Sequence, residues 1–251
     1  MLDVNQALTT AYRKPPRAVA APRRALVIGA AGALGAAVLE HLLGTQRFER
    51  VGALVEQPMQ HAVRGFAPVL AGDLAAFAAD CALIVFDRQR AANGREAAFV
   101  KPQPQALPAL AQQLHGAGVR HLIVVVPHTP SLLPMALQHG LASIDEAAVA
   151  ALGFEQLVFM RMAQSERVAV GLDVPRRLAR WMLSQLHWMI PQREQPVRAD
   201  TVAKVAAAVA VHCAAAPSAT RVVTAALLWQ AAQQRDVQAL VQQWLQPAAA
   251  R

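Results

Sequence analysis

Short apolar runs alternate with longer amphipathic stretches along most of the chain. The short runs are typical of buried strands in a parallel sheet, while the longer stretches repeat apolar residues at the three- and four-residue spacing of a helix. This alternation indicates a doubly wound α/β fold, with a parallel sheet, helices on both faces and a small C-terminal helical part. The pattern predicts strands at 25–29, 51–55, 67–70, 82–86, 121–126, 156–161 and 220–224. It predicts helices at 32–43, 74–79, 104–115, 144–152, 175–188, 200–213 and 225–245.

The beginning of the sequence differs in composition from the rest. Residues 1–24 are rich in proline and arginine, with five basic residues against one acidic residue. We therefore expect a basic N-terminal tail over residues 1–24 and a single domain over residues 25–251, with a C-terminal helical elaboration from about residue 165. Such a charge run is typical of a solvated segment, and contact with a nucleic acid or a membrane surface is the alternative.

Composition disfavours several classes of protein. Hydrophobic residues make up 55% of the chain and charged residues 16%, which predicts a folded core. No apolar run reaches the roughly 20 residues that cross a bilayer and no apolar leader opens the sequence, so we expect a cytoplasmic protein without membrane contact. The net charge of +8 comes without interleaved aromatic residues, which disfavours nucleic acid as a partner. Cys81 and Cys213 are far apart in apolar segments and predict small buried thiols, and no residue spacing predicts a metal site.

Residues 25–39 contain the most informative motif. A buried strand ends at Gly29, and Gly32 and Gly35 follow at intervals of three residues before a helix. Glycine lets the backbone turn sharply and approach a pyrophosphate, toward which the first amides of the helix then point. A GxxGxxG turn between a strand and a helix is typical of a Rossmann dinucleotide-binding unit. The predicted cofactor-binding residues of this turn are Gly29, Ala31, Gly32, Ala33, Leu34 and Gly35.

Acidic residues follow the second and third strands. Glu56 comes 21 residues after Gly35, where the Rossmann arrangement places a carboxylate that accepts hydrogen bonds from the adenosine ribose. A carboxylate there repels a 2′-phosphate, so Glu56 favours NAD over NADP; a solvated strand end explains it equally well. Asp73 and Leu74 follow the third strand near the expected adenine position, although Asp73 also fits the N-cap of a helix that begins at Leu74.

With these elements in order, residues 25–228 resemble the atypical short-chain dehydrogenase/reductases (SDRs), in their NAD(P)-binding, epimerase-like branch. Besides the glycine turn, the resemblance rests on the turn Gly72-Asp73-Leu74 and on the segments 118–124 (GVRHLIV), 151–161 (ALGFEQLVFMR) and 196–203 (PVRADTVA). It implies a Rossmann fold and a nicotinamide dinucleotide as cofactor.

The same resemblance implies a Tyr-x-x-x-Lys pair and a serine after the fifth strand. The single tyrosine of the chain is Tyr12, before the first strand. The family's spacing places the tyrosine near Gln138, the lysine near Ala142 and the serine within 126–128. Glutamine and alanine cannot transfer a proton near neutral pH, so we expect no standard dehydrogenase reaction. The lysines of the chain are Lys14, Lys101 and Lys204.

Other residues near the ends of the strands carry weaker signals. Asp87 follows the fourth strand, where it would repel a pyrophosphate that Arg88 and Arg90 could contact. His128, after the fifth strand, is the one candidate for a catalytic base, and a rigid proline-bracketed loop is the simpler explanation. Residues 143–146 (SIDE) fit a capping box at the start of a helix.

Three functions follow from these observations. The first is a catalytically inactive or divergent NAD(P)-binding protein with a sensor or assembly role. The second is an oxidoreductase or epimerase that uses other residues, such as His128. The third is an interaction protein with a vestigial nucleotide site, which Asp87 and the basic tail favour. Besides a nucleotide cofactor, a protein partner or a homo-oligomer is a further expectation, because the apolar C-terminal helices fit a subunit interface as well as core packing.

Overall fold

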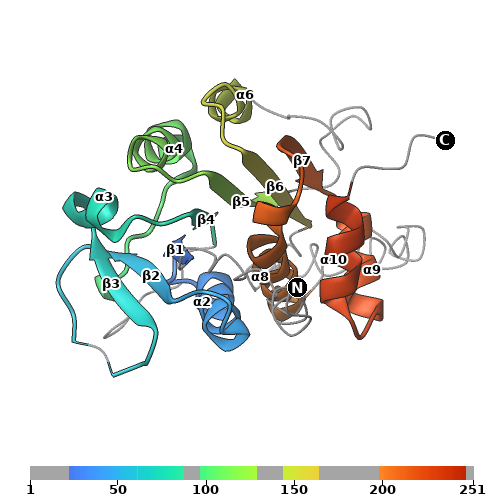
Figure 1. Ribbon diagram of the computed structural model, residues 1–251, viewed down its shortest axis with the longest axis horizontal. Coiled ribbons are helices and arrows are strands. Elements are labelled where there is room, and N and C mark those ends of the chain that lie inside the picture. The colour runs from blue at the N-terminus through green and yellow to red at the C-terminus, as the bar shows by residue number, and fades with distance from the viewer. Residues whose placement is uncertain (1–22, 61, 88–96, 129–143, 164–197, 247–251) are drawn as a thin grey trace, which may run out of the picture.

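The computed structural model describes residues 23–60, 62–87, 97–128, 144–163 and 198–246. Within these ranges seven strands form one sheet in the order β3-β2-β1-β4-β5-β6-β7 (Figure 1). Every neighbouring pair of strands is parallel. The strands are β1 (Arg24–Ile28), β2 (Arg50–Val55), β3 (Phe66–Leu70), β4 (Cys81–Val85), β5 (His121–His128), β6 (Gln156–Ala163) and β7 (Ala219–Val223).

The position of β1 sets the location of the candidate site. From β1 the chain adds β2 and β3 on one side, and it then returns to place β4 on the other side of β1. The strand order therefore reverses between β1 and β4, as in a Rossmann fold. Ligands of open α/β sheets bind beyond the carboxyl ends of the strands at such a reversal.

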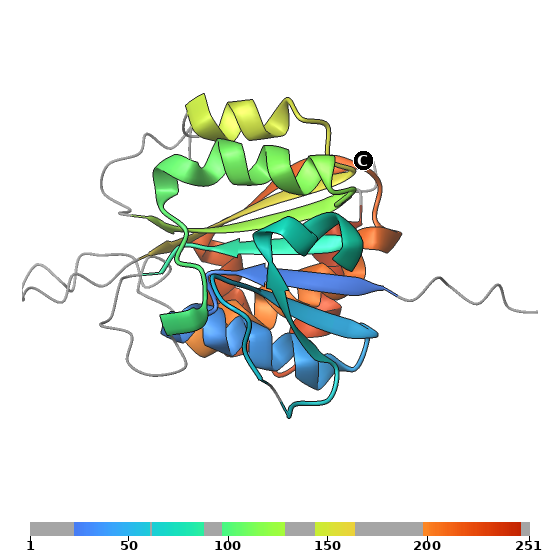
Figure 2. The same ribbon diagram turned by 90° about the vertical axis from the view of Figure 1, so that its left-hand side faces the viewer.

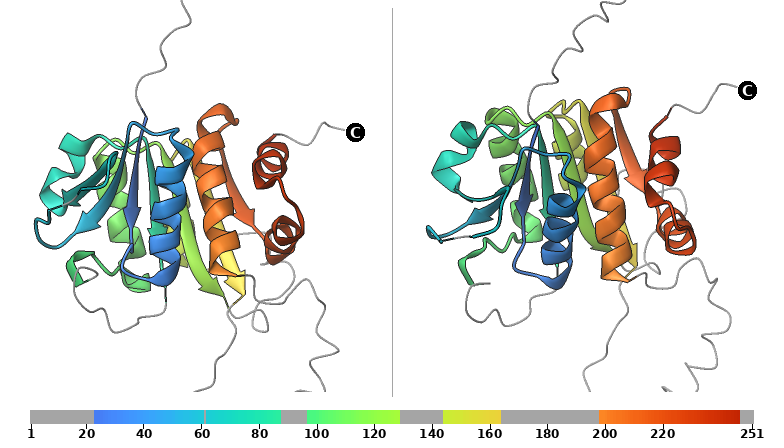
Figure 3. Two further views of the ribbon diagram at one scale, coloured as in Figure 1. Left: turned by 90° about the horizontal axis from the view of Figure 1, so that it is seen from below. Right: turned by 60° about the horizontal axis from the view of Figure 1, so that its bottom comes forward.

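Helices cover both faces of the sheet (Figure 2). One layer holds α2 (Ala33–Thr45) and α8 (Ala199–His212), with α9 (Ala225–Gln233) and α10 (Val237–Leu245) beside α8 (Figure 3). The other layer holds α3 (Leu74–Phe77), α4 (Leu107–Gly116) and α6 (Ile144–Ala150). Three short 3₁₀ turns complete the described elements, at η1 (Ala71–Asp73), η3 (Pro104–Ala106) and η7 (Cys213–Ala215).

Alternate residues of the strands supply the two halves of the core. In β1, Ala25 and Val27 pack with the layer of α2 and α8, while Leu26 and Ile28 pack with the layer of α3, α4 and α6. Both sets are almost completely buried. Burial on both faces explains why the strands read as continuous apolar runs rather than as an apolar–polar alternation.

Helix α8 has buried residues around most of its circumference. It packs against α2 on one side and α10 on the other. Its buried residues are all alanine or valine, whose small side chains let neighbouring helices approach closely: Val202, Ala203, Val205, Ala206, Ala207, Ala208, Val209 and Ala210. None of the helices in the described ranges is both long and apolar enough to cross a membrane.

All seven predicted strands are confirmed within two residues at either end. The prediction of one helix over 225–245 is wrong: α9 ends at Gln233 and α10 begins at Val237. The break arises because the Asp236 side chain accepts a hydrogen bond from Ala239 N–H at 3.0 Å and caps a new helix. The helix predicted at 175–188 lies outside the described residues.

Two arginines that the sequence analysis assigned to the tail belong to the folded domain. Arg24 begins β1. Arg23 donates hydrogen bonds to the carbonyl oxygens of Val211 and Ala210, at 2.8 and 2.9 Å, and its guanidinium lies over the ring of Phe48. Arg23 thus connects the start of β1 to the end of α8.

Candidate functional site

The glycine turn has the backbone geometry that its motif predicts. Gly29 follows β1 with a φ of +96°, a conformation that side chains disfavour. A Cβ at Gly29 would collide with the carbonyl oxygen of Val85 in β4, and a Cβ at Gly35 would collide with the carbonyl oxygen of Gly29. Close packing between β1, β4 and α2 therefore explains two of the three glycines without any ligand.

Gly32, the third glycine, faces the side chain of Asp87. It is the N-cap residue of α2, and a Cβ there would lie 2.5 Å from Asp87 Oδ2. The same oxygen accepts a hydrogen bond from the amide N–H of Leu34 at 2.9 Å. Amides in the first turn of a helix lack partners within the helix, so a carboxylate from elsewhere in the chain stabilises this end of α2. Asp87 thus accepts from an amide of the turn that the sequence predicts to bind a cofactor.

The segment that follows residue 96 pairs with the end of β2. Phe99 forms an antiparallel bridge with Val55, at the end of β2. Glu56 N–H donates to the carbonyl oxygen of Ala98 at 2.8 Å, and Val100 N–H donates to the carbonyl oxygen of Leu54 at 3.0 Å. The end of β2, to which the sequence analysis assigns the adenosine ribose, is therefore paired with the chain itself.

A proline completes the cover over the turn. The Cδ atom of Pro102 lies 3.3 Å from the position of a Cβ at Gly29. Pro102 lies two residues after Val100, the last residue of the segment that pairs with β2. Side-chain and backbone atoms of the protein therefore border the glycine turn from two directions, with Asp87 at Gly32 and Pro102 at Gly29.

Both residues that the sequence predicts to contact adenosine are exposed. Glu56 lies just beyond β2. Asp73 is exposed and is the N-cap residue of α3, but its side chain makes no capping hydrogen bond. Asp73 thus occupies the N-cap position that the alternative interpretation predicts, but its side chain does not cap the helix. Leu74 begins α3 and packs against the core.

The positions at which an SDR would transfer a proton lie mostly outside the described residues. Gln138 and Ala142 fall there, as do Arg88 and Arg90. His128 is the last residue of β5 and pairs in register with Ala163 of β6, so its backbone lies at the carboxyl edge of the sheet.

A buried ion pair, which the sequence analysis missed, joins α6 to β6. Arg161 donates to Glu146 Oε2 at 2.7 Å, and both side chains are more than nine-tenths buried. In the sequence, Glu146 fits a capping box with Ser143, which lies outside the described residues. Nothing in the sequence around Glu146, an acidic residue in the first turn of a helix, indicates an ion pair with an arginine 15 residues later in a strand.

The cysteines are buried, as predicted, and the fold brings them together. Cys81 begins β4 and Cys213 follows α8. A hydrogen bond with Cys213, together with burial, raises the pKa of the Cys81 thiol well above its usual range. Within the described part of the chain, no group of three or more histidine, cysteine or acidic side chains is arranged to hold a metal ion.

No protein-family model matches this sequence, and no match is found among curated proteins. Several solved structures are similar. The UDP-N-acetylglucosamine 4-epimerase of Bacillus cereus is 14% identical, with 80% of this chain and 79% of that chain covered and a TM-score of 0.42. A short-chain dehydrogenase/reductase family oxidoreductase of Burkholderia thailandensis is 18% identical, with 80% and 91% covered and a TM-score of 0.42. The Bordetella bronchiseptica enzyme WbmG in complex with NAD is 16% identical, with 83% of each chain covered and a TM-score of 0.41.

Proposed function

We propose that this chain is an SDR-like Rossmann protein that has lost its dinucleotide site and does not act as a dehydrogenase, which favours an interaction role. Its dinucleotide crevice is vestigial. The single observation that carries this proposal is the hydrogen bond from Leu34 N–H to the Asp87 carboxylate, in the place where a cofactor's diphosphate would need the same amide. The absence of a Tyr-x-x-x-Lys pair from the sequence supports the catalytic half of the proposal.

Electrostatics explains why Asp87 and a diphosphate exclude one another. Two like charges 4 Å apart repel by about 4 kcal/mol at an effective dielectric constant of about 20. A diphosphate carries more than one negative charge and would have to displace Asp87 from Leu34 before using that amide. The pairing of the segment 98–100 with the end of β2 adds a second barrier on the adenosine side.

Calorimetric titration with NAD and NADP tests this proposal. We expect no measurable binding to the native protein at millimolar cofactor, and a gain of NAD binding of at least tenfold in Asp87→Ala, because that variant removes the competing carboxylate. Asp145→Ala, which removes an exposed acid from the first turn of α6, is the matched control and should behave as the native protein.

Cofactor preference adds a second readout. In the Asp87→Ala background NAD should bind more tightly than NADP, because the Glu56 carboxylate would repel a 2′-phosphate. Replacing Glu56 by glutamine in the same background should narrow that difference. Micromolar affinity of the native protein for either cofactor, or hydride transfer to any carbonyl substrate, would overturn the proposal.

A further inference from the structure

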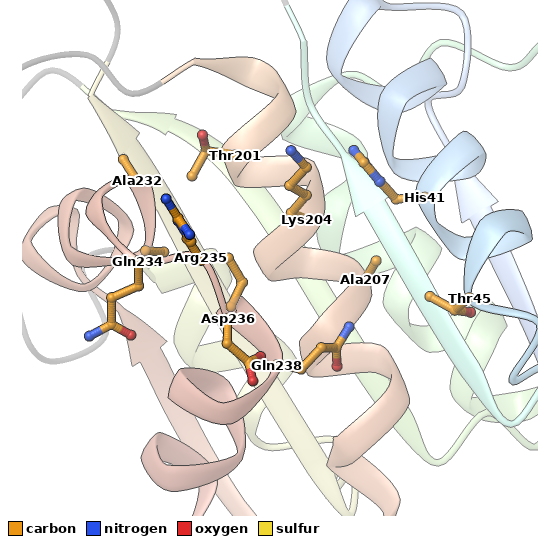
Figure 4. Close-up of a pocket in the computed structure, with 12 residues that line it drawn as sticks. His41, Thr45, Thr201, Lys204, Ala207, Ala232, Gln234, Arg235, Asp236 and Gln238 are labelled. Carbon is orange, nitrogen blue, oxygen red and sulfur yellow. The ribbon is translucent and has the colours of Figure 1, made fainter.

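A polar cavity lies away from the glycine turn, between α2, α8 and the connection from α9 to α10 (Figure 4). Its volume of about 340 Å³ is at the lower end of the range for small-ligand pockets, about 300–1,000 Å³. His41 lies eight residues beyond the first residue of α2, so about 12 Å of helix separates it from the turn. No residue of the glycine turn lines this cavity.

Basic side chains from three elements line the cavity. His41 comes from α2, Lys204 and Thr201 come from α8, and Arg235 comes from the α9–α10 connection (Figure 4). The break between α9 and α10 places Arg235 there, since a continuous helix over 225–245 would leave no connection at this point. The cavity is therefore a product of the same break that the sequence analysis failed to predict.

The nearby carboxylates already have partners. Asp200 accepts from Lys204 Nζ through Oδ2 and contacts His41 Nε2 through Oδ1, each at 2.7 Å. These hydrogen bonds, from Lys204 first and then His41, lower the pKa of the Asp200 carboxyl. Asp236 accepts from Ala239 N–H at the start of α10. Both negative charges are thus engaged within the protein.

Arg235 differs from the other charged groups of the cavity. Among the described residues it forms no ion pair and no hydrogen bond, although Asp236 is its neighbour in sequence. A guanidinium offers five N–H donors in a planar fork that matches the oxygens of a phosphate or a carboxylate. Lys204 uses one of its three N–H donors on Asp200 and keeps two for a ligand.

We propose that this cavity binds a small metabolite through an oxyanion, a phosphate or a carboxylate group, held between Arg235 and Lys204. The Thr201 hydroxyl supplies a neutral hydrogen bond beside them. The remaining volume, walled in part by Ala207 and Ala231, accommodates the uncharged part of such a molecule. The proposal is independent of the dinucleotide crevice and of any catalytic role.

Titration of the full chain with inorganic phosphate and with succinate tests the proposal. Total ionic strength is held constant with sodium chloride, so that general charge screening is the same in every sample. We expect one or both ions to bind by calorimetry and to raise the unfolding temperature. Phosphate binding alone indicates a phosphorylated ligand, and succinate binding alone indicates a carboxylate.

Variants assign the binding to the cavity. Arg235→Gln and Lys204→Gln should each weaken the affinity at least tenfold, whereas Lys101→Gln, which removes an exposed lysine elsewhere, should leave it unchanged. Asp87→Ala should also leave it unchanged, which separates this site from the crevice. Failure of both ions to bind at millimolar concentration, or equal binding by Arg235→Gln and the native protein, would overturn the proposal.

Discussion

Gly35 illustrates how a sequence motif can have a structural cause at the level of one residue. Its α-carbon lies so close to the end of β1 that a methyl group would collide with the carbonyl oxygen of Gly29. Gly44, in the same helix, has nothing within 4 Å of the position where a Cβ would be built. The same substitution, glycine to alanine, should therefore have opposite effects on stability at these two positions of one helix.

We expect Gly35→Ala to lower the free energy of unfolding by about 1–3 kcal/mol, the usual cost of overpacking a core. Gly44→Ala should raise it by about 0.5–1 kcal/mol, because alanine has the higher helix propensity. Urea denaturation of the two variants beside the native protein checks both values. Similar stability of Gly35→Ala and the native protein would contradict the packing explanation.

His121 is a second residue whose environment has a measurable consequence. It begins β5, it is 3% exposed, and its Nδ1 has no hydrogen-bond partner among the described residues. Burial lowers the pKa of the His121 imidazole below its usual range. The unfolded chain therefore binds a proton here more readily than the folded chain, so this residue destabilises the protein as the pH falls below about 6.5.

Replacing His121 by phenylalanine should remove that contribution. Between pH 7.5 and pH 5 the unfolding temperature of the native protein should fall more than that of His121→Phe, as measured by differential scanning calorimetry. His212→Asn, at a side chain that is not buried, serves as the control for a histidine outside the core. Parallel pH curves for His121→Phe and the native protein would rule out the assigned role.

At the scale of elements, the ion pair between Glu146 and Arg161 fixes α6 against β6. Removing one member of a buried pair leaves the other charged and without its partner, which costs about 3–5 kcal/mol. We expect Glu146→Gln to lose stability of that order in chemical denaturation. Asp145→Asn, one residue earlier and exposed, should change stability little. A loss below about 1 kcal/mol in Glu146→Gln would show that the pair contributes little.

The local pattern of apolar and polar residues predicts which helices and strands exist better than it predicts where each one begins and ends. The strands were found because burial on both faces leaves runs such as 121–126 without a polar residue after His121. The break at residues 234–236 was missed because Gln234, Arg235 and Asp236 also fit the exposed face of a continuous helix. The structure differs from a continuous helix in the extended backbone of Gln234 and in the capping contact of Asp236 with Ala239.

At the scale of the whole molecule, the alternation of strands and helices predicts a doubly wound parallel sheet, and the structure confirms it. The candidate site was predicted only in part. The glycine turn follows β1 and Glu56 follows β2, as the predicted element order requires, and the sequence also predicts that Asp87 is unfavourable to a diphosphate. Its hydrogen bond to Leu34 joins residues 53 positions apart. The cavity at Arg235 likewise needs three helices placed in space, which no local pattern contains.

The burial of α8 has a consequence for how the protein is made. Arg23, at the first strand, needs the carbonyl groups at the end of α8, and α8 in turn is covered by α10. A ribosome releases these segments in sequence, and the last of them ends at Leu245. The part of the alanine and valine surface of α8 that α10 covers thus stays exposed until α10 has left the ribosome, so the nascent chain cannot complete this part of its core before then.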